Sequence, residues 1–138
     1  MNLKDLIFDN FEECETYIQL EGMREQVCIA LSDDLMAYEE ELSEQYKEQI
    51  AAFVAQHNKW MESCLKEIAA YAKSAYNISP NLEEVDLLNI YVLFEQGDSP
   101  IFGLGFWTAF DTEHGCGIKI TGNSLHIMEV GDASVAFC

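Results

Sequence analysis

The fold of this chain is decided by residues 42–75, LSEQYKEQIAAFVAQHNKWMESCLKEIAAYAKSA, in which neither Gly nor Pro occurs. Apolar side chains recur there every three to four residues, the period of an α-helix with one buried and one solvated face. The stripe consists of Leu42, Tyr46, Ile50, Phe53, Val54, His57, Trp60, Met61, Cys64, Leu65, Ile68, Ala72 and Ala75. The spacing predicts a long amphipathic helix with Trp60, Met61 and Cys64 in the core.

The predicted helix extends over about residues 34–76. Ser32, Asp33 and Asp34 offer side-chain oxygens for an N-cap and negative charge for the first turn. A straight helix of about 30 residues would be about 45 Å long, which is longer than a compact domain of this size needs. We therefore expect a bend near His57 and Asn58, which are two weak helix formers.

Strand-like segments flank this helix. Runs of β-branched and aromatic residues at 16–20 and 26–31 are separated by a Gly-containing connection, which predicts a hairpin. Further expected elements are strands at 89–94, 101–110, 117–121 and 124–130, a short helix at 81–88, and an edge strand or loose arm at 3–11. The order predicts a single α+β domain over residues 1–138, with a mostly antiparallel sheet packed against the long helix.

Glycines mark two special places in the predicted strands. Gly122 and Asn123 lie between apolar runs and are typical of a tight hairpin turn, because both tolerate positive φ. Gly103 and Gly105 alternate with large apolar residues along one strand. A strand face without side chains indicates the close approach of another element, and the long helix is the element expected there.

The charge of the chain is large and segregated. It carries 25 Asp and Glu against 7 Lys and Arg, a formal net charge of -18. Residues 1–45 hold 13 acids and 2 bases, residues 46–81 hold 3 and 4, and residues 82–138 hold 9 and 1. Such a surface repels nucleic acid and anionic lipid and attracts a basic protein. Adaptation to high salt would produce a similar excess of acids, and so would selection for solubility alone.

The cysteines and the N-terminus indicate a cytoplasmic protein. Cys14, Cys28, Cys64, Cys116 and Cys138 are scattered, without the close Cys or His pairs of a zinc site. Reduced thiols fit a reducing compartment, and Cys138 is expected to be the most exposed. The first residues lack the apolar run of a signal peptide, and no apolar stretch approaches the roughly 20 residues that cross a bilayer.

The densest group of chemically capable side chains is the segment 111–117. Asp111, Glu113 and His114 carry groups that ligate metals or transfer protons, whereas Gly115 and Gly117 allow the backbone to reverse between two strands. A catalytic site needs convergent groups from distant segments, which the sequence does not supply here. We expect a structural turn, with a binding loop as the first alternative and a metal or catalytic site as the second.

A second group consists of acidic residues in the N-terminal third, which are candidates for docking a basic partner. Like charges at close helical spacing are destabilising, so their clustering favours a functional role beside that of a solvated helix start. Trp107 follows Phe106 on a strand, so one of the two is expected to be exposed as an interface anchor. The candidate partner-binding residues are Glu12, Glu13, Glu15, Asp33, Asp34, Glu39, Glu40, Glu41, Glu44 and Trp107.

The segments 106–118 and 130–133 resemble a family of small uncharacterised, immunity-protein-like bacterial domains. The signature of that family is W-D-x-E-H-G-x-G-I/V, followed by a V-G tail, and its members carry a charged amphipathic helix in the middle. Phe110 stands here where those proteins usually have Trp. The resemblance implies the same fold and a bacterial source, and it carries no activity.

These observations favour a binding protein without catalytic residues, cofactor or metal. We expect an acidic bacterial immunity protein that binds and neutralises a basic toxin domain acting on nucleic acid, since such enzymes hold phosphates with Lys and Arg. The alternatives are a metal-binding module or metal-dependent enzyme using Asp111, Glu113 and His114, and an acidic structural domain. His57 and His126 are expected to be partly buried and hydrogen-bonded.

Overall fold

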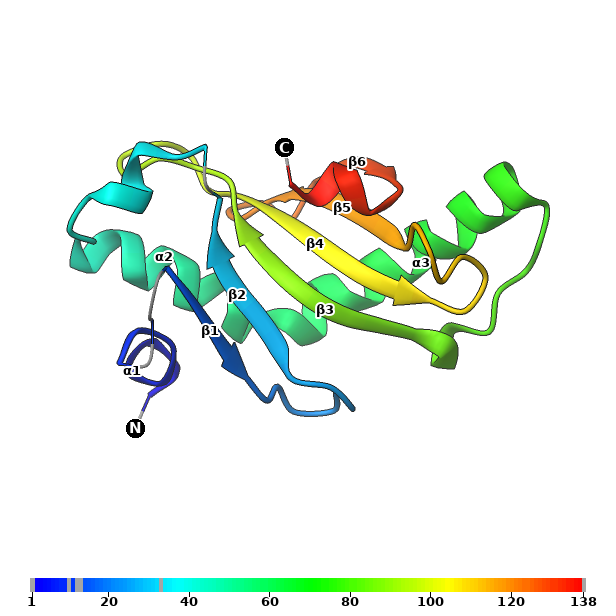
Figure 1. Cartoon of the computed structure of the whole chain (residues 1–138), viewed down its shortest axis with the longest axis horizontal. Helices are drawn as coiled ribbons and strands as arrows, with labels where there is room; N and C mark the ends of the chain where they lie inside the picture. The colour runs from blue at the N-terminus through cyan, green and yellow to red at the C-terminus, as the bar shows by residue number, and fades with distance from the viewer. Residues whose placement is uncertain (1, 10, 12–13, 33, 138) are drawn as a thin grey trace.

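The computed structural model describes residues 2–9, 11, 14–32 and 34–137, which form an open sheet and a layer of helices (Figure 1). The strands are β1 (Glu15–Ile18), β2 (Val27–Leu31), β3 (Val85–Val92), β4 (Ile101–Thr108), β5 (Cys116–Thr121) and β6 (Ile127–Gly131). The helices are α1 (Leu3–Phe8), α2 (Glu44–Ala55) and α3 (His57–Tyr76), with 3-10 turns η1 (Met36–Glu39), η2 (Leu82–Glu84) and η3 (Ala133–Ala136). The predicted α+β class is confirmed.

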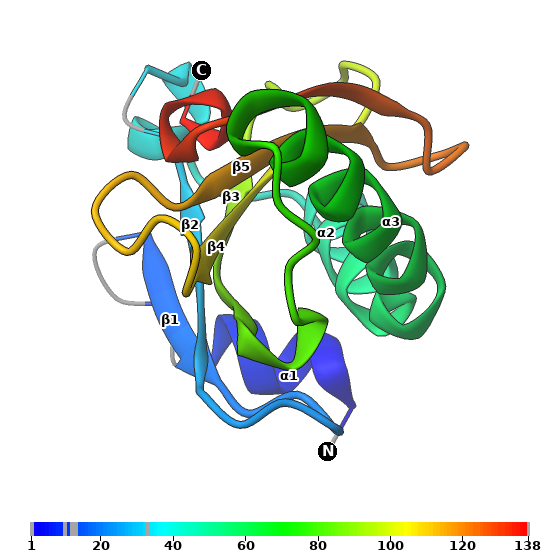
Figure 2. The same ribbon diagram turned by 90° about the vertical axis from the view of Figure 1, so that its right-hand side faces the viewer.

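The strands lie side by side in chain order. β1 and β2 form the antiparallel hairpin that the sequence predicts, and β3 to β6 form an antiparallel meander. β2 and β3 are parallel, so a crossover must join them, and it consists of η1, α2, α3 and η2. Both long helices therefore cover one face of the sheet, and η3 lies on the other (Figure 2).

The long helix begins later than predicted. The Ser43 hydroxyl accepts a hydrogen bond from the Tyr46 N–H and caps α2, whereas the segment after Ser32 forms the η1 turn. The cap predicted at Ser32–Asp34 is therefore wrong, and Asp33 lies outside the described residues. The reason is that the backbone N–H groups at the start of η1 are capped instead by the carboxylate of Glu95, from the β3–β4 connection.

The predicted bend is confirmed. Gln56, with φ -95° and ψ 18°, separates α2 from α3, and the second helix starts at His57. α3 ends at Tyr76, where Asn77 adopts the left-handed conformation and satisfies the last carbonyls. The His57 ring is 9% exposed and hydrogen-bonded, as expected.

The segment expected as an edge strand or loose arm is a helix. Asn2 caps α1 by accepting a hydrogen bond from the Asp5 N–H, and Ile7 lies fully buried in the core. The prediction was wrong because the helical spacing of Leu3, Leu6 and Ile7 extends over only two turns, too short to stand out from a strand pattern.

β3 also begins earlier than predicted. Asn81 caps η2 as expected, but the turn ends at Glu84 and Val85 already pairs with Thr108 of β4. A bulge at Leu88 places two adjacent residues against one of β4, which breaks the alternation that marks a strand in the sequence.

Gly103 does meet another element, but that element is η3 and not the long helix. A Cβ on Gly103 would lie 1.9 Å from the carbonyl oxygen of Ala136, so the sheet and η3 touch backbone to backbone. The helices pack on the opposite face, where the ring of Phe102 stacks on Phe53 at 3.9 Å between centroids. The close approach was predicted correctly, and its partner was not.

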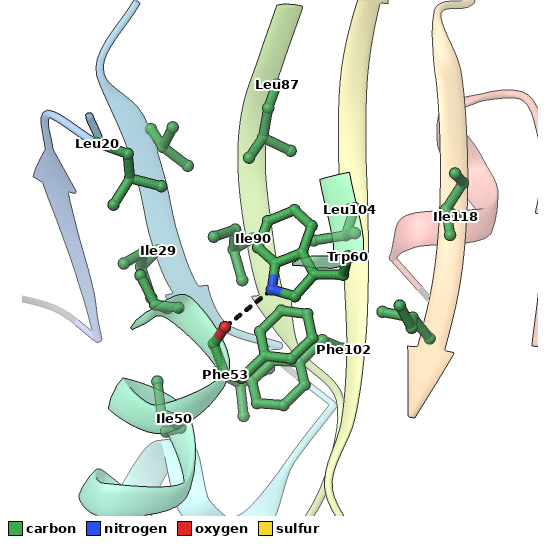
Figure 3. Close-up of a cluster of buried hydrophobic side chains, with 14 of the residues drawn as sticks. Leu20, Ile29, Ile50, Phe53, Trp60, Leu87, Ile90, Phe102, Leu104 and Ile118 are labelled. Carbon is green, nitrogen blue, oxygen red and sulfur yellow. Dashed lines mark hydrogen bonds between the residues drawn. The ribbon is translucent and has the colours of Figure 1, made fainter. Parts of the chain in front are cut away.

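A stack of three rings fills the centre of the core between the sheet and the helices (Figure 3). Phe53 of α2 lies between Phe102 of β4 and Trp60 of α3, within 6° of parallel to each. The Trp60 indole N–H also donates to the Phe53 carbonyl at 2.8 Å, across the bend between α2 and α3. Trp60 and Cys64 are buried and Met61 is half-buried, consistent with the predicted stripe.

The β5–β6 turn differs from the expected two-residue turn. The connection covers residues 122–126, and the positive φ of 55° falls on Leu125. The Thr121 hydroxyl accepts from the His126 N–H and closes this wider loop. His126 is therefore exposed, contrary to expectation, because it precedes the strand instead of lying in it.

Cys14 is half-buried and Cys28, Cys64 and Cys116 are buried, all four as thiols outside any disulfide, while Cys138 lies outside the described residues. None of the helices in the described part of the chain combines the length and apolar character that a bilayer crossing requires.

Candidate functional site

The segment 111–117 is a turn whose polar groups are occupied within the molecule. The Asp111 carboxylate accepts from the His114 N–H at 3.0 Å and from the Tyr76 hydroxyl at 2.5 Å. The Asp111 carbonyl accepts from the Gly115 N–H, and the His114 carbonyl accepts from the Ala133 N–H. The turn therefore ties together the end of α3, the β4–β5 connection and the start of η3.

The two glycines of this segment are required by close backbone contacts. Gly115 has a φ of +63°, and a Cβ there would lie 2.6 Å from the Phe106 carbonyl oxygen. A Cβ on Gly117 would lie 2.5 Å from the Asp132 carbonyl oxygen. Both positions exclude a side chain for reasons of packing, which favours the structural interpretation of the segment.

The same hydrogen bonds set the electrostatics of the turn. The Tyr76 hydroxyl, and then the His114 N–H, hold the pKa of Asp111 below its ordinary value, and the same bond raises the pKa of Tyr76. Glu113 is exposed. Within the described ranges, no three His, Cys, Asp or Glu side chains come together as a metal-ligand set.

Replacing Asp111 with Asn should lower the melting temperature at neutral pH, because the carboxylate is the better acceptor for both donors. The pKa is depressed in the folded state, so the contribution of Asp111 is complete above the ordinary value of 3.8 and is lost as the pH falls through the depressed pKa. Thermal unfolding from about pH 7 down to about pH 2.5 should show the two proteins converging. Glu113→Gln, at an exposed neighbour, is the control, and a pH-independent difference would contradict this account.

A cluster of acidic residues, here termed the acidic edge, lies at the end of the sheet where η1 meets the β3–β4 connection (upper left in Figure 1). Its members are Glu39, Glu40, Glu41, Glu95 and Asp98. Gln96 joins the two segments, because its amide accepts from the Ser43 N–H at 2.9 Å and donates to the Glu41 carbonyl at 3.0 Å. Exposed acids from segments more than 50 positions apart in the sequence thus lie at one end of the molecule, while the half-buried Glu95 carboxylate is occupied by the N–H groups of Met36 and Ala37.

The acidic edge is not neutralised by the bases of the chain. Among the described residues, no ion pair reaches any of its five carboxylates. Glu44 differs, because it pairs with Lys4 at 2.9 Å and Lys47 at 3.8 Å, and the hydrogen bond from Lys4 lowers its pKa. Glu44 is therefore separated in role from Glu39, Glu40 and Glu41.

The sheet face opposite the helices carries exposed aromatic side chains, and we call it the open face. Trp107 is 37% exposed there while Phe106 is buried, as the sequence predicts for one of the two. Tyr17 of β1 is 59% exposed, and the ring of Tyr91 on β3 packs against Phe137 at 4.8 Å. These side chains alternate with core residues along β1, β3 and β4, so they project from the same side.

Glu15 adds a carboxylate to the open face, at the start of β1. Cys28, on the neighbouring strand, lies 3.8 Å from it through its sulfur. Burial, and then the charge of Glu15, raise the pKa of the Cys28 thiol. Both effects disfavour the thiolate, which is the nucleophilic form of a cysteine.

Of the remaining acids predicted to bind a partner, the structure describes only Asp34. Asp34 is exposed, near the acidic edge in sequence, and its N–H donates to the Ser32 hydroxyl. Glu12, Glu13 and Asp33 lie outside the described residues. The sequence did not identify three aromatic residues of the open face, Tyr17, Tyr91 and Phe137. Alternation along a strand separates its side chains into two faces, but it does not show which face the helices cover.

The open face and the acidic edge are thus the surfaces from which a function is inferred. The chain matches no protein-family model, no curated protein and no solved structure.

Proposed function

We propose that this chain is an acidic binding protein of the immunity type, which neutralises a basic toxin domain acting on nucleic acid. The observation that carries the proposal is the acidic edge, whose carboxylates have no ion-pair partner among the described residues. The exposed rings of the open face also support it, because they offer apolar contacts for a bound partner.

The two surfaces contribute different steps of binding. An enzyme that cleaves nucleic acid presents Lys and Arg where phosphates bind, and the edge carboxylates can occupy those positions. Long-range attraction between the negative acidic edge and the positive toxin surface accelerates association of the two proteins. Burial of rings such as Trp107 then slows their dissociation. This mechanism assigns no bond-making step to the chain, and it operates in the bacterial cytoplasm.

The experiment first asks whether the reading frame directly upstream encodes a protein with a basic domain, and then measures association of that purified domain with this chain. In the edge variant, Glu39, Glu40 and Glu41 are replaced by Lys, which changes the formal net charge by 3 × 2, from -18 to -12. At low salt the variant should associate about tenfold to hundredfold more slowly, because the steering charge is reversed. Stopped-flow fluorescence at two salt concentrations gives both rates.

A matched control separates the position of the charges from their number. Glu67, Glu84 and Glu113 are exposed, form no ion pair among the described residues and lie outside the edge, and their replacement by Lys gives the same net charge. The control variant should retain most of the wild-type rate. Equal slowing of both variants, or a wild-type rate that salt leaves unchanged, would contradict the proposal.

A further inference from the structure

A groove with an apolar floor opens at the other end of the sheet from the acidic edge. Its walls are the β1–β2 connection, the first half of α3, and η2 with the start of β3, and its volume is about 630 Å³. Met61 and Leu65 of α3 and Val85 and Leu87 of β3 are among the apolar side chains that line it. The volume lies within the range of about 300–1,000 Å³ that ligand-binding pockets have.

The β1–β2 connection is held in place, so the groove is a built feature. The His57 ring contacts the Val54 carbonyl at 3.1 Å and the Glu21 carbonyl at 3.2 Å, joining the bend between α2 and α3 to the connection. Arg24 reaches the other wall, where it pairs with Asp86 at 2.7 Å and donates to the Glu83 carbonyl. Figure 2 shows this connection at the bottom of the molecule, close to η2 and below α3.

The lining of the groove is strongly negative. Five carboxylates contribute to it against one guanidinium, and Asp86 already engages that guanidinium. The others are Glu21 and Glu25 on the connection, Glu62 on α3 and Glu83 on η2; all four are exposed, and Glu62 also pairs with Lys66 at 3.8 Å. An apolar floor between acidic walls is complementary to a segment with apolar side chains on one side and Lys or Arg at its margins.

We propose that this groove binds a basic amphipathic helix of a partner protein, with its apolar side chains on Met61 and Leu65. A helix presents apolar residues at i, i+3, i+4 and i+7 as one narrow stripe, which matches a groove walled by α3 on one side. A second copy of this chain is disfavoured as the occupant, because it carries the same excess of negative charge. The site is separate from the acidic edge, so it does not depend on the function proposed above.

The test uses synthetic peptides of about 18 residues, about 27 Å long as helices. The first has Leu at helical spacing and Lys elsewhere, the second has the same composition without the periodicity, and the third has Glu in place of Lys. Fluorescence anisotropy should show the first peptide binding at least about tenfold more tightly than either of the others. Methyl NMR should show shifts at Met23 and Met61, which line the groove, and not at the exposed Met128.

Two pairs of charge reversals locate the site. Glu25→Lys with Glu62→Lys should weaken binding of the first peptide at least about tenfold, because both residues line the groove. Glu67→Lys with Glu113→Lys gives the same net charge outside the groove and should weaken it less than about threefold. The edge variant should also bind the peptide, so failure of the toxin experiment and failure of this one are distinguishable.

Three results would overturn the inference. Equal affinity for the periodic and non-periodic peptides would mean that charge alone accounts for binding and that no helical apolar stripe is recognised. Equal effects of the two pairs of reversals would place the peptide elsewhere on the surface. Methyl shifts confined to Met128 would place it on β6.

Discussion

Replacing Trp60 with Ala should lower the free energy of unfolding by about 3–5 kcal/mol, the range measured for large aromatic side chains in protein cores. The side chain is 1% exposed, its ring stacks on Phe53 at 4.9 Å, and its N–H satisfies the Phe53 carbonyl. The truncation therefore leaves a cavity at the junction of α2 and α3 and removes the indole hydrogen bond there, while the Phe53 carbonyl keeps its bond from the Gln56 N–H. The loss is large beside the roughly 5–15 kcal/mol of a typical domain.

The second tryptophan supplies a matched control. Trp107 is 37% exposed on the open face, and its replacement by Ala should cost less than about 1 kcal/mol. Urea unfolding followed by far-UV circular dichroism compares the two variants without relying on the tryptophan that each has lost. Similar losses in both would mean that the ring stack is not the centre of the core.

Gly103→Ala should have the next largest effect, with a cost of about 3 kcal/mol, at the upper end of the usual penalty for overpacking. The new Cβ would lie 1.9 Å from the carbonyl oxygen of Ala136 and 2.7 Å from its carbonyl carbon, so backbone must move. We expect η3 to separate from β4 before the sheet itself unfolds. Hydrogen exchange of residues 133–137 should therefore accelerate, together with a lower unfolding midpoint.

Gly105→Ala is the control on the same strand face. A Cβ there would lie 3.5 Å from the side chain of Asn89, an ordinary van der Waals contact. Its stability should stay within about 1 kcal/mol of the wild type, since Ala also restricts the unfolded chain. Two results would contradict the backbone contact between η3 and the sheet. One is that the amides of η3 stay protected from exchange in Gly103→Ala, and the other is that their exchange accelerates in both Gly103→Ala and Gly105→Ala.

The sequence predicted the features that depend on local periodicity. The apolar stripe of residues 42–75 identified the helical layer, its excessive length predicted a break, and the weak helix formers His57 and Asn58 located that break. The β1–β2 hairpin and the cap at Asn81 were likewise readable from neighbouring residues. Each of these features is set by contacts between residues close in the chain.

The features that were missed depend on contacts between distant segments. Ser32 and Asp34 have the composition of a helix N-cap, yet Glu95, which is far along the chain, caps a 3-10 turn there instead. Gly103 predicted a close approach without identifying η3, and the apolar lining of the groove comes from three separate segments. The distribution of charge along the sequence predicted that the acids cluster. It did not predict which of them are paired: Lys4 pairs with Glu44, whereas no base in the described part of the chain pairs with Glu39, Glu40 or Glu41.

The most direct test of the central claim is growth of bacteria that produce this chain together with a basic toxin domain encoded by the neighbouring reading frame, where that frame is found to encode one. The wild-type chain and the variant carrying Glu67→Lys, Glu84→Lys and Glu113→Lys should restore growth and protect cellular nucleic acid. The edge variant and Trp107→Ala, produced at equal levels, should protect poorly. If the wild-type chain gives no protection, or the edge variant protects as well as the wild type, the acidic edge is not an inhibitory surface.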